Sequence, residues 1–124
     1  MRQRTKRFAL RIIRLFRALP KAEEARILGR QFLRSGTGVA ANYRSACRAR
    51  SGADFVSKIG IALEEADETA FWLELLIEAE IISEQRLKAL LAEADELVRI
   101  FSATRTTAKK RRAITNHKSE ITNT

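Results

Sequence analysis

Arginines at helical spacing are the residues of this sequence whose chemistry is most distinctive. Arg4, Arg7, Arg11 and Arg14 recur every three or four residues, a spacing that places side chains on one face of a helix. A second ladder runs between residues 26 and 48, and a basic run follows near the end of the chain. A guanidinium donates two parallel hydrogen bonds to a phosphate, so these ladders predict a nucleic-acid interface. Its candidate residues are Arg4, Arg7, Arg11, Arg14, Arg26, Arg30, Arg44, Arg48, Lys109, Lys110, Arg111 and Arg112.

The charges are distributed unevenly along the chain, whose net charge is +9. Residues 1–50 hold 14 Lys and Arg against 2 acids, residues 51–100 hold 4 against 12, and residues 101–124 hold 6 against 1. The basic half can therefore pair with the acidic half of the same chain, of a neighbouring subunit or of an acidic partner protein. A structural or protein-interaction adaptor built on such pairing is the alternative to nucleic-acid binding.

Residues for catalysis or metal binding are scarce. His117 is the only histidine and lies in the C-terminal tail, outside the expected bundle, and Cys47 is the only cysteine. We therefore expect neither a Ser/His/Asp set nor the Glu-x-x-His ligands of a di-iron bundle. The stretch Ser35-Gly-Thr-Gly38 lacks the Gly-Lys-Ser/Thr continuation of a phosphate loop and instead favours close helix packing. We expect a protein that is not an enzyme and that holds no cofactor or metal.

The apolar pattern predicts four helices, over about residues 6–19, 22–49, 52–79 and 84–104. Pro20 ends the first helix, and Ser51 with Asp54 forms a capping box at the start of the third. Short connections between such helices favour an all-α, up-and-down antiparallel four-helix bundle over residues 1–104. Residues 105–124 form a basic tail that we expect to be disordered, because it offers no apolar face.

Polar residues occupy places on these helices where core residues are expected. Ser35 and Asn42 lie on the seam of the second helix, and Glu65 and Glu68 lie on a stripe of the third. Buried polar pairs fix register and oligomeric state more reliably than they add stability. We predict a structural polar network of Arg34, Ser35, Asn42, Lys58, Glu65 and Glu68.

The third helix carries a second stripe with large apolar residues, Ile61, Trp72 and Leu75. A lone four-helix bundle needs one apolar face per helix, so this surplus surface predicts an oligomer interface. The alternative is that the third helix is central and touches two neighbours within one chain.

Aromatic side chains bear on how a nucleic acid would be recognised, because unpaired bases stack on exposed rings. Phe8, Phe16, Phe32, Phe55 and Phe101 all fall on predicted core stripes. We therefore expect recognition of the nucleic-acid backbone or shape and no base stacking.

The hydropathy pattern and the number of cysteines indicate the cellular compartment of the protein. Arg, Lys or Glu interrupts every apolar run before the roughly 18 residues of a membrane span, so no membrane partner is expected. A single cysteine agrees with a reducing compartment, which predicts a cytoplasmic protein. The acid-free first 21 residues can also be read as a mitochondrial presequence, although they contain no serine.

Many residues between Phe8 and Phe101 match a known pattern in order and spacing. They include Arg34-Ser35, Val39-Ala-Ala-Asn42-Tyr43, Ser51, Asp54-Phe55, Lys58, Ile61-Ala62, Glu64-Glu65-Ala66, Glu68-Thr69, Trp72-Leu73 and Leu75-Leu76. This pattern resembles the bacterial four-helix-bundle family first met in intervening sequences of 23S rRNA genes. Gly36 and Gly38 depart from the residues more usual in that family, which bears on the stiffness of the second helix.

The resemblance implies a short antiparallel bundle that assembles into a ring-shaped homopentamer, with no known enzymatic activity. It extends more distantly to the accessory protein of diversity-generating retroelements, a basic pentameric bundle that binds a reverse transcriptase and nucleic acid. The partners implied by resemblance are therefore further copies of the chain, RNA, and a reverse transcriptase or another RNA enzyme.

Overall fold

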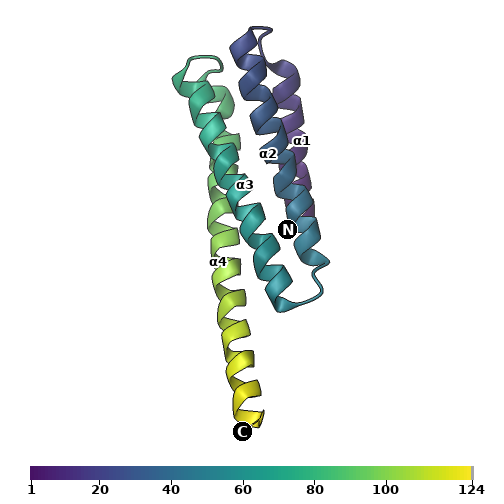
Figure 1. The fold of residues 1–124 in the computed structure, drawn as a ribbon. Coiled ribbons are helices and arrows are strands. Elements are labelled where there is room, and N and C mark those ends of the chain that lie inside the picture. Colours follow the sequence, from purple (N-terminus) through teal and green to yellow (C-terminus); the bar gives the residue numbers. More distant parts are fainter. Residues whose placement is uncertain (124) are drawn as a thin grey trace.

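Four helices joined by short turns form the protein in the computed structural model, which describes residues 1–123 except the side chains of 119, 122 and 123. They are α1 (Arg2–Ala18), α2 (Glu23–Cys47), α3 (Gly52–Glu78) and α4 (Glu84–Asn123). Consecutive helices run antiparallel, with α2 packed between α1 and α3, and α3 packed between α2 and α4 (Figure 1). The predicted all-α four-helix fold is confirmed for these residues. The central place of α3 matches the alternative explanation of its second stripe.

The core follows the apolar seams of the four helices. Phe8, Phe32 and Phe101 are fully buried, whereas Phe16 and Phe55, which we also expected in the core, are only partly buried. The largest aliphatic side chains around the three buried rings are Ile12, Val39, Ile59, Leu73, Leu76, Leu87 and Leu97. Fully burying each such side chain contributes about 1.5–3 kcal/mol, so these seams hold the helices in place.

Helices α1 and α2 approach each other closely at Gly36. A Cβ atom on Gly36 would lie 2.7 Å from Ile12 Cγ1 and 2.8 Å from Ile12 Cγ2. This spacing is shorter than real Cβ contacts, so the glycine is what lets the two backbones come together. The interpretation of residues 35–38 as a close-packing patch is confirmed at this position.

The turn between α3 and α4 is a Schellman motif. The amide of Ile81 donates to the carbonyl of Leu76, and that of Glu80 donates to the carbonyl of Ile77. Glu80 takes the left-handed conformation of this motif, with φ 60°, which glycine usually occupies. The two hydrogen bonds of the motif hold Glu80 in this unfavourable conformation. The turn then leads the chain back along α3 as α4.

Helix α4 is longer than the sequence pattern suggested. The prediction of a disordered tail after Thr104 is wrong for the described residues, because α4 continues without a break to Asn123. No glycine or proline occurs after residue 84, and alanine, lysine and arginine are strong helix formers even without a buried face. The extension projects past the other three helices (Figure 1). Residue 124, the last of the predicted tail, lies outside the described residues.

The other helix boundaries differ from prediction by a few residues. Helix α1 begins at Arg2, four residues before the predicted start, and α2 ends at Cys47, two residues before the predicted end. The earlier start of α1 matters for function, because it places Arg2 and Lys6 on a helix.

Candidate nucleic-acid interface

A cationic cleft lies between the start of α1 and the end of α2. Arg2 and Lys6 line it from α1, Arg44 and Arg48 line it from α2, and its volume is about 440 Å³. Antiparallel packing brings these two pairs together, each pair being spaced four residues apart on its own helix. The other lining residues are Gln3, Thr5, Ala40 and Ala41, so no acid compensates the four charges.

Two of these four residues were not among the predicted contacts. Arg44 and Arg48 were predicted, whereas Arg2 and Lys6 were missed. Their spacing of four residues was visible in the sequence, but they lay ahead of or at the edge of the expected helix. A helix start placed at residue 2 would have identified them.

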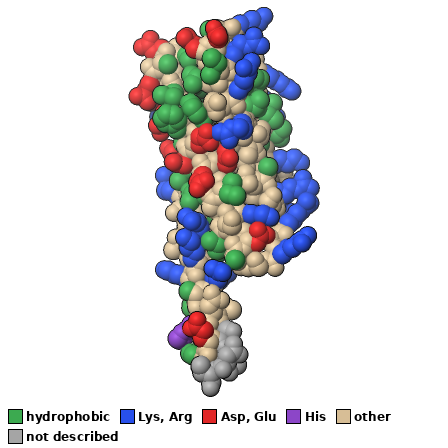
Figure 2. Space-filling model, in the orientation of Figure 1, with side chains coloured by type: hydrophobic (Ala, Val, Ile, Leu, Met, Phe, Trp, Pro, Cys, Tyr) green, Lys and Arg blue, Asp and Glu red, His purple; other side chains and the backbone are tan. Residues whose placement is uncertain are grey.

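Further basic side chains extend this surface along α2. Arg26 and Arg30, both exposed, lie with Lys21 around a shallow hollow of about 390 Å³ near the start of α2, which also holds Glu23. Figure 2 shows Lys and Arg side chains in a column along the edge formed by α1 and α2, with acidic side chains gathered toward the α3–α4 turn. The charge segregation along the sequence is thus also a segregation in space.

Arg4 is engaged within the chain. Its Nε and Nη2 donate hydrogen bonds to the two oxygens of Glu93, at 2.8 and 2.7 Å, and Nη2 lies 3.0 Å from Glu96 Oε1. These hydrogen bonds raise the pKa of Arg4. The hydrogen bond from Arg4, with smaller effects of Arg11 and Arg7, lowers the pKa of Glu93. Arg4 therefore fastens α1 to α4 and is not a free cation of the ladder.

The other predicted arginines of α1 lie near Glu93, are exposed to solvent, or both. Arg7 and Arg11 lie close enough to Glu93 to act on its carboxylate, while Arg7 and Arg14 are exposed. The alternative of charge pairing is thus realised on α1 at Arg4, and the cleft on the α2 side is the surface without such compensation.

The predicted polar network is partly assembled, between α2 and α3. Arg34 Nη2 lies 2.5 Å from Glu68 Oε1, and Arg34 Nη1 lies 3.6 Å from Glu65 Oε2. Glu68 also accepts a hydrogen bond from the indole nitrogen of Trp72, at 3.3 Å. The hydroxyl of Ser35, fully buried, is paired at 2.8 Å with that of Thr69, a partner that the sequence analysis missed.

Two predicted members lie outside this network. Asn42 donates to the carbonyl oxygen of Gly38 on its own helix, at 2.8 Å. Lys58 pairs with Asp54, 3.4 Å away and one turn earlier on α3. Both residues satisfy neighbours on their own helix, so they do not fix the register between helices.

Glu65 is the member of the network whose surroundings disfavour the charged form of its side chain. Burial raises its pKa, with Glu68 and Glu64 adding to the effect and the charge of Arg34 opposing it. Its Oε2 is buried without a hydrogen-bond partner. A Cβ on Gly38 would lie 3.2 Å from Glu65 Cδ, so this glycine provides the room in which the carboxylate sits.

The second stripe of α3 remains partly uncovered although α3 is central. Ile61 is 40% exposed, Trp72 is half-buried against the core, and Leu75 is half-buried. Phe71, which we did not predict, is 50% exposed and contacts the Trp72 ring edge to face, with 5.1 Å between centroids. Apolar side chains are therefore exposed at two places on the outside of this helix, at Ile61 and at Phe71, and Glu64, Glu65 and Glu68 lie between them in the sequence.

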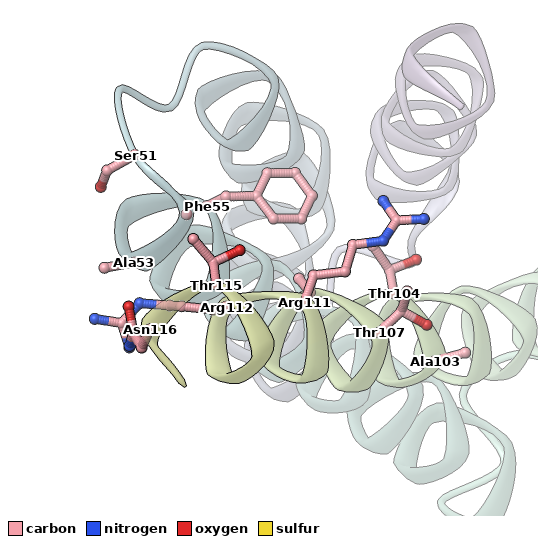
Figure 3. A pocket seen from close by; sticks show the side chains of 12 residues that line it. Ser51, Ala53, Phe55, Ala103, Thr104, Thr107, Arg111, Arg112, Thr115 and Asn116 are labelled. Carbon is pink, nitrogen blue, oxygen red and sulfur yellow. The ribbon is translucent and has the colours of Figure 1, made fainter. Parts of the chain in front are cut away.

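The predicted basic run of the C-terminal region lies on the extension of α4. Lys109 and Lys110 are exposed there. Arg111 and Arg112 line a groove between this extension and the start of α3 (Figure 3). The structure thus turns what was expected to be a loose basic tail into one wall of a defined surface.

Two further features were sought among the residues that the structure describes, a metal-ligand cluster and a membrane-spanning helix. No three His, Cys, Asp or Glu side chains among them gather as metal ligands would. Of the four helices as described, none has the length and apolarity needed to cross a membrane.

Comparison with known proteins identifies the bundle. A family model described as 23S rRNA-intervening sequence protein matches residues 1–103. The chain belongs to this family. The resemblance inferred from the residues of α2 and α3 is thereby confirmed. A search of curated proteins gives no match for this 23S rRNA-intervening sequence protein.

A solved structure shares the fold of this 23S rRNA-intervening sequence protein. It is the crystal structure of a protein with unknown function from the S23 ribosomal protein family of Bacteroides thetaiotaomicron. The two chains are 37% identical, with a TM-score of 0.78 over 83% of this chain and 95% of the other. The family model ends at residue 103, so most of the α4 extension lies beyond the matched part.

Proposed function

We propose that this chain is a non-enzymatic, cytoplasmic RNA-binding protein that acts as a homo-oligomeric scaffold or as an accessory to an RNA enzyme. The observation that carries the proposal is the cleft of Arg2, Lys6, Arg44 and Arg48, in which four cations meet without an acid. Uncompensated cations on two helices bind successive phosphates and release the counterions condensed on them. Membership of the 23S rRNA-intervening sequence protein family supports RNA as the ligand.

The salt dependence of RNA binding tests this proposal. For single-stranded RNA, the slope of log K against log salt becomes shallower by about 0.7 for each phosphate contact that is removed. The double variant Arg44→Gln, Arg48→Gln should therefore weaken binding and reduce the slope by about 1 to 2. Fluorescence anisotropy of a labelled single-stranded RNA, titrated between about 50 and 200 mM salt, measures both quantities.

The matched control removes the same charge elsewhere. Arg86 and Arg99 are exposed on α4, amid the acidic half, and the variant Arg86→Gln, Arg99→Gln should leave the slope unchanged. Absence of RNA binding by the unmodified protein at low salt contradicts the proposal. Equal effects of the two double variants contradict the assignment of the cleft, because net charge alone would then explain binding.

The homo-oligomer is supported by the exposed apolar side chains of α3. Ile61 and Phe71 are exposed on a helix that already packs on two neighbours. We expect an oligomer, a homopentamer by family resemblance, whose mass falls to that of one chain in the variant Ile61→Ser, Phe71→Ser. Light scattering measures the mass, and Leu10→Ser on α1, where Leu10 is 42% exposed, is the control. A single-chain mass for the unmodified protein rejects this part of the proposal.

Charge pairing between chains is the second candidate function. It is favoured by the pairing of Arg4 with Glu93 and Glu96 and of Arg34 with Glu68 within one chain, which leaves exposed acids such as Glu74 and Glu78 near the α3–α4 turn. An adaptor of this kind forms complexes that dissociate at high salt. Light scattering at low and high salt distinguishes it from assembly through Ile61 and Phe71, since apolar burial resists salt.

A further inference from the structure

A groove separates the start of α3 from the extension of α4. Its volume is about 850 Å³, which lies within the range of sites that hold small organic groups. One wall comes from Ser51 to Phe55, and the other runs along α4 from Ala103 to Asn116. Figure 3 shows Phe55 above α4, facing the turns that carry Thr107 and Thr115.

Phe55 provides this groove with an aromatic wall. The ring packs against the core from one side and is only partly buried. On the side of α4 it faces small residues, since Thr104, Thr107 and Ala108 line the opposite wall. A ring that is only partly covered on one side is the kind of surface on which an unpaired base stacks.

The charge of the groove selects an anionic ligand. Arg111 and Arg112 line it, and no acid does. The nearest acid along α3, Asp54, is engaged by Lys58 and by the backbone of Arg50. Positive charge beside an aromatic ring suits a phosphate attached to a flat base.

The polar residues of the groove favour a base over an acidic peptide. Thr107 and Thr115 offer hydroxyls that both donate and accept, and Asn116 offers an amide. The hydroxyl of Thr104 donates to the carbonyl of Ile100, at 2.8 Å, and can still accept. Mixed donors and acceptors match the edge of a base, whereas an acidic side chain only accepts. The groove also holds a single aromatic ring in place of the apolar row that a helical peptide would need.

The groove and the cationic cleft lie at the same end of the molecule. Arg48 lines the cleft and Ser51 lines the groove. Three residues span at most about 11 Å, so one RNA strand can run from the cleft to the groove. The groove's second wall begins at residue 103, where the family model ends, so this feature belongs to the α4 extension of this chain.

We infer that the groove between α3 and the α4 extension binds an unpaired nucleotide of RNA, whose base stacks on Phe55 and whose flanking phosphates contact Arg111 and Arg112. This inference rests on the proposed RNA binding and adds base stacking to it. It replaces the sequence-based expectation that stacking plays no part. The partner is accordingly single-stranded RNA, and a fully paired duplex does not use the groove.

The test compares two phenylalanines that are both half-buried. Phe55→Leu keeps an apolar side chain against the core but removes the ring, and Phe16→Leu does the same far from the groove, beside Phe32. Stacking of one base predicts that Phe55→Leu weakens binding of single-stranded RNA by about 5- to 100-fold with an unchanged salt slope. Phe55→Tyr retains the affinity, and duplex RNA of the same sequence is unaffected by all three variants. Fluorescence anisotropy measures each affinity, and circular dichroism confirms that the variants remain helical.

The outcomes separate this inference from the proposed function. If single-stranded RNA binds the unmodified protein and Phe55→Leu equals Phe16→Leu, the stacking site is refuted and RNA binding stands. If no RNA binds at all, the proposed function fails first. If labelled poly-glutamate binds in place of RNA and depends on Phe55, the groove takes an acidic peptide and the inference is overturned. Photocrosslinking of 5-bromouridine RNA to peptides containing residues 51–55 or 103–116 gives an independent readout, and crosslinks confined to α2 refute the site.

Discussion

Replacing Gly36 by alanine tests how closely α1 and α2 are packed. The new Cβ would lie 2.7, 2.8 and 3.1 Å from three carbons of Ile12, and the last of these is the Cβ itself, which cannot move without the α1 backbone. Overpacking of this kind costs about 1–3 kcal/mol. Alanine recovers about 0.5–1 kcal/mol of helix propensity, so we expect a net loss of about 1 kcal/mol. For a domain of this size the loss corresponds to a Tm lower by roughly 3–6 °C.

Gly60 on α3 is the matched control for this prediction. A Cβ there would lie 3.4 Å from Arg105 Nε, which is ordinary contact with a flexible side chain. Gly60→Ala should therefore raise stability by about 0.5–1 kcal/mol. Thermal unfolding followed by circular dichroism compares the two variants at one protein concentration, because assembly makes Tm depend on concentration. Equal stabilisation by both would refute the close approach of α1 and α2.

Three further predictions concern charge and turn geometry. Arg4→Gln should destabilise the fold at pH 7 by on the order of 1 kcal/mol. The pKa of Glu93 is lowered in the fold, so this contribution is fully present above the ordinary carboxyl pKa and is lost as the pH falls through the lowered pKa. The difference between the variant and the unmodified protein should therefore shrink on acidification. Glu65→Gln should instead stabilise the fold and raise the Tm at pH 7, because burial raises the pKa of Glu65 and its charged form disfavours folding. If the gain in Tm does not shrink on acidification, burial of the charge is not the cause. Glu80→Gly should stabilise by about 1 kcal/mol, measured by urea unfolding, because φ 60° strains any residue with a Cβ; a loss would mean that the Glu80 side chain has a role of its own.

The four helices and their order could be predicted because their determinants are local. Apolar spacing identifies the buried face of each helix. Pro20 separates α1 from α2, and the Ser51 hydroxyl caps α3 by accepting a hydrogen bond from the amide of Asp54. The family was also within reach, since the residues that carry it lie mainly on α2 and α3. The boundary of α4 was missed because the expectation relied on a buried face, while helix propensity without any breaker was sufficient.

Only the tertiary structure decides which of the predicted arginines face an acidic side chain. Arg4 and Arg44 are the same residue type at the same helical spacing, yet Glu93 lies opposite Arg4 and no acid lines the cleft at Arg44. Sequence spacing specifies the face of a helix but not the side chain that another helix places before it.

The same reasoning applies to Phe55. Its place on the core stripe was determined by the sequence, but whether that stripe is covered depends on the small residues that α4 brings against it. The sequence alone therefore determined a basic four-helix protein with two arginine ladders. Only the packing of α1 on α2 and of α4 past α3 decided which charges are compensated and which ring is left open, because both depend on contacts between residues far apart in the chain.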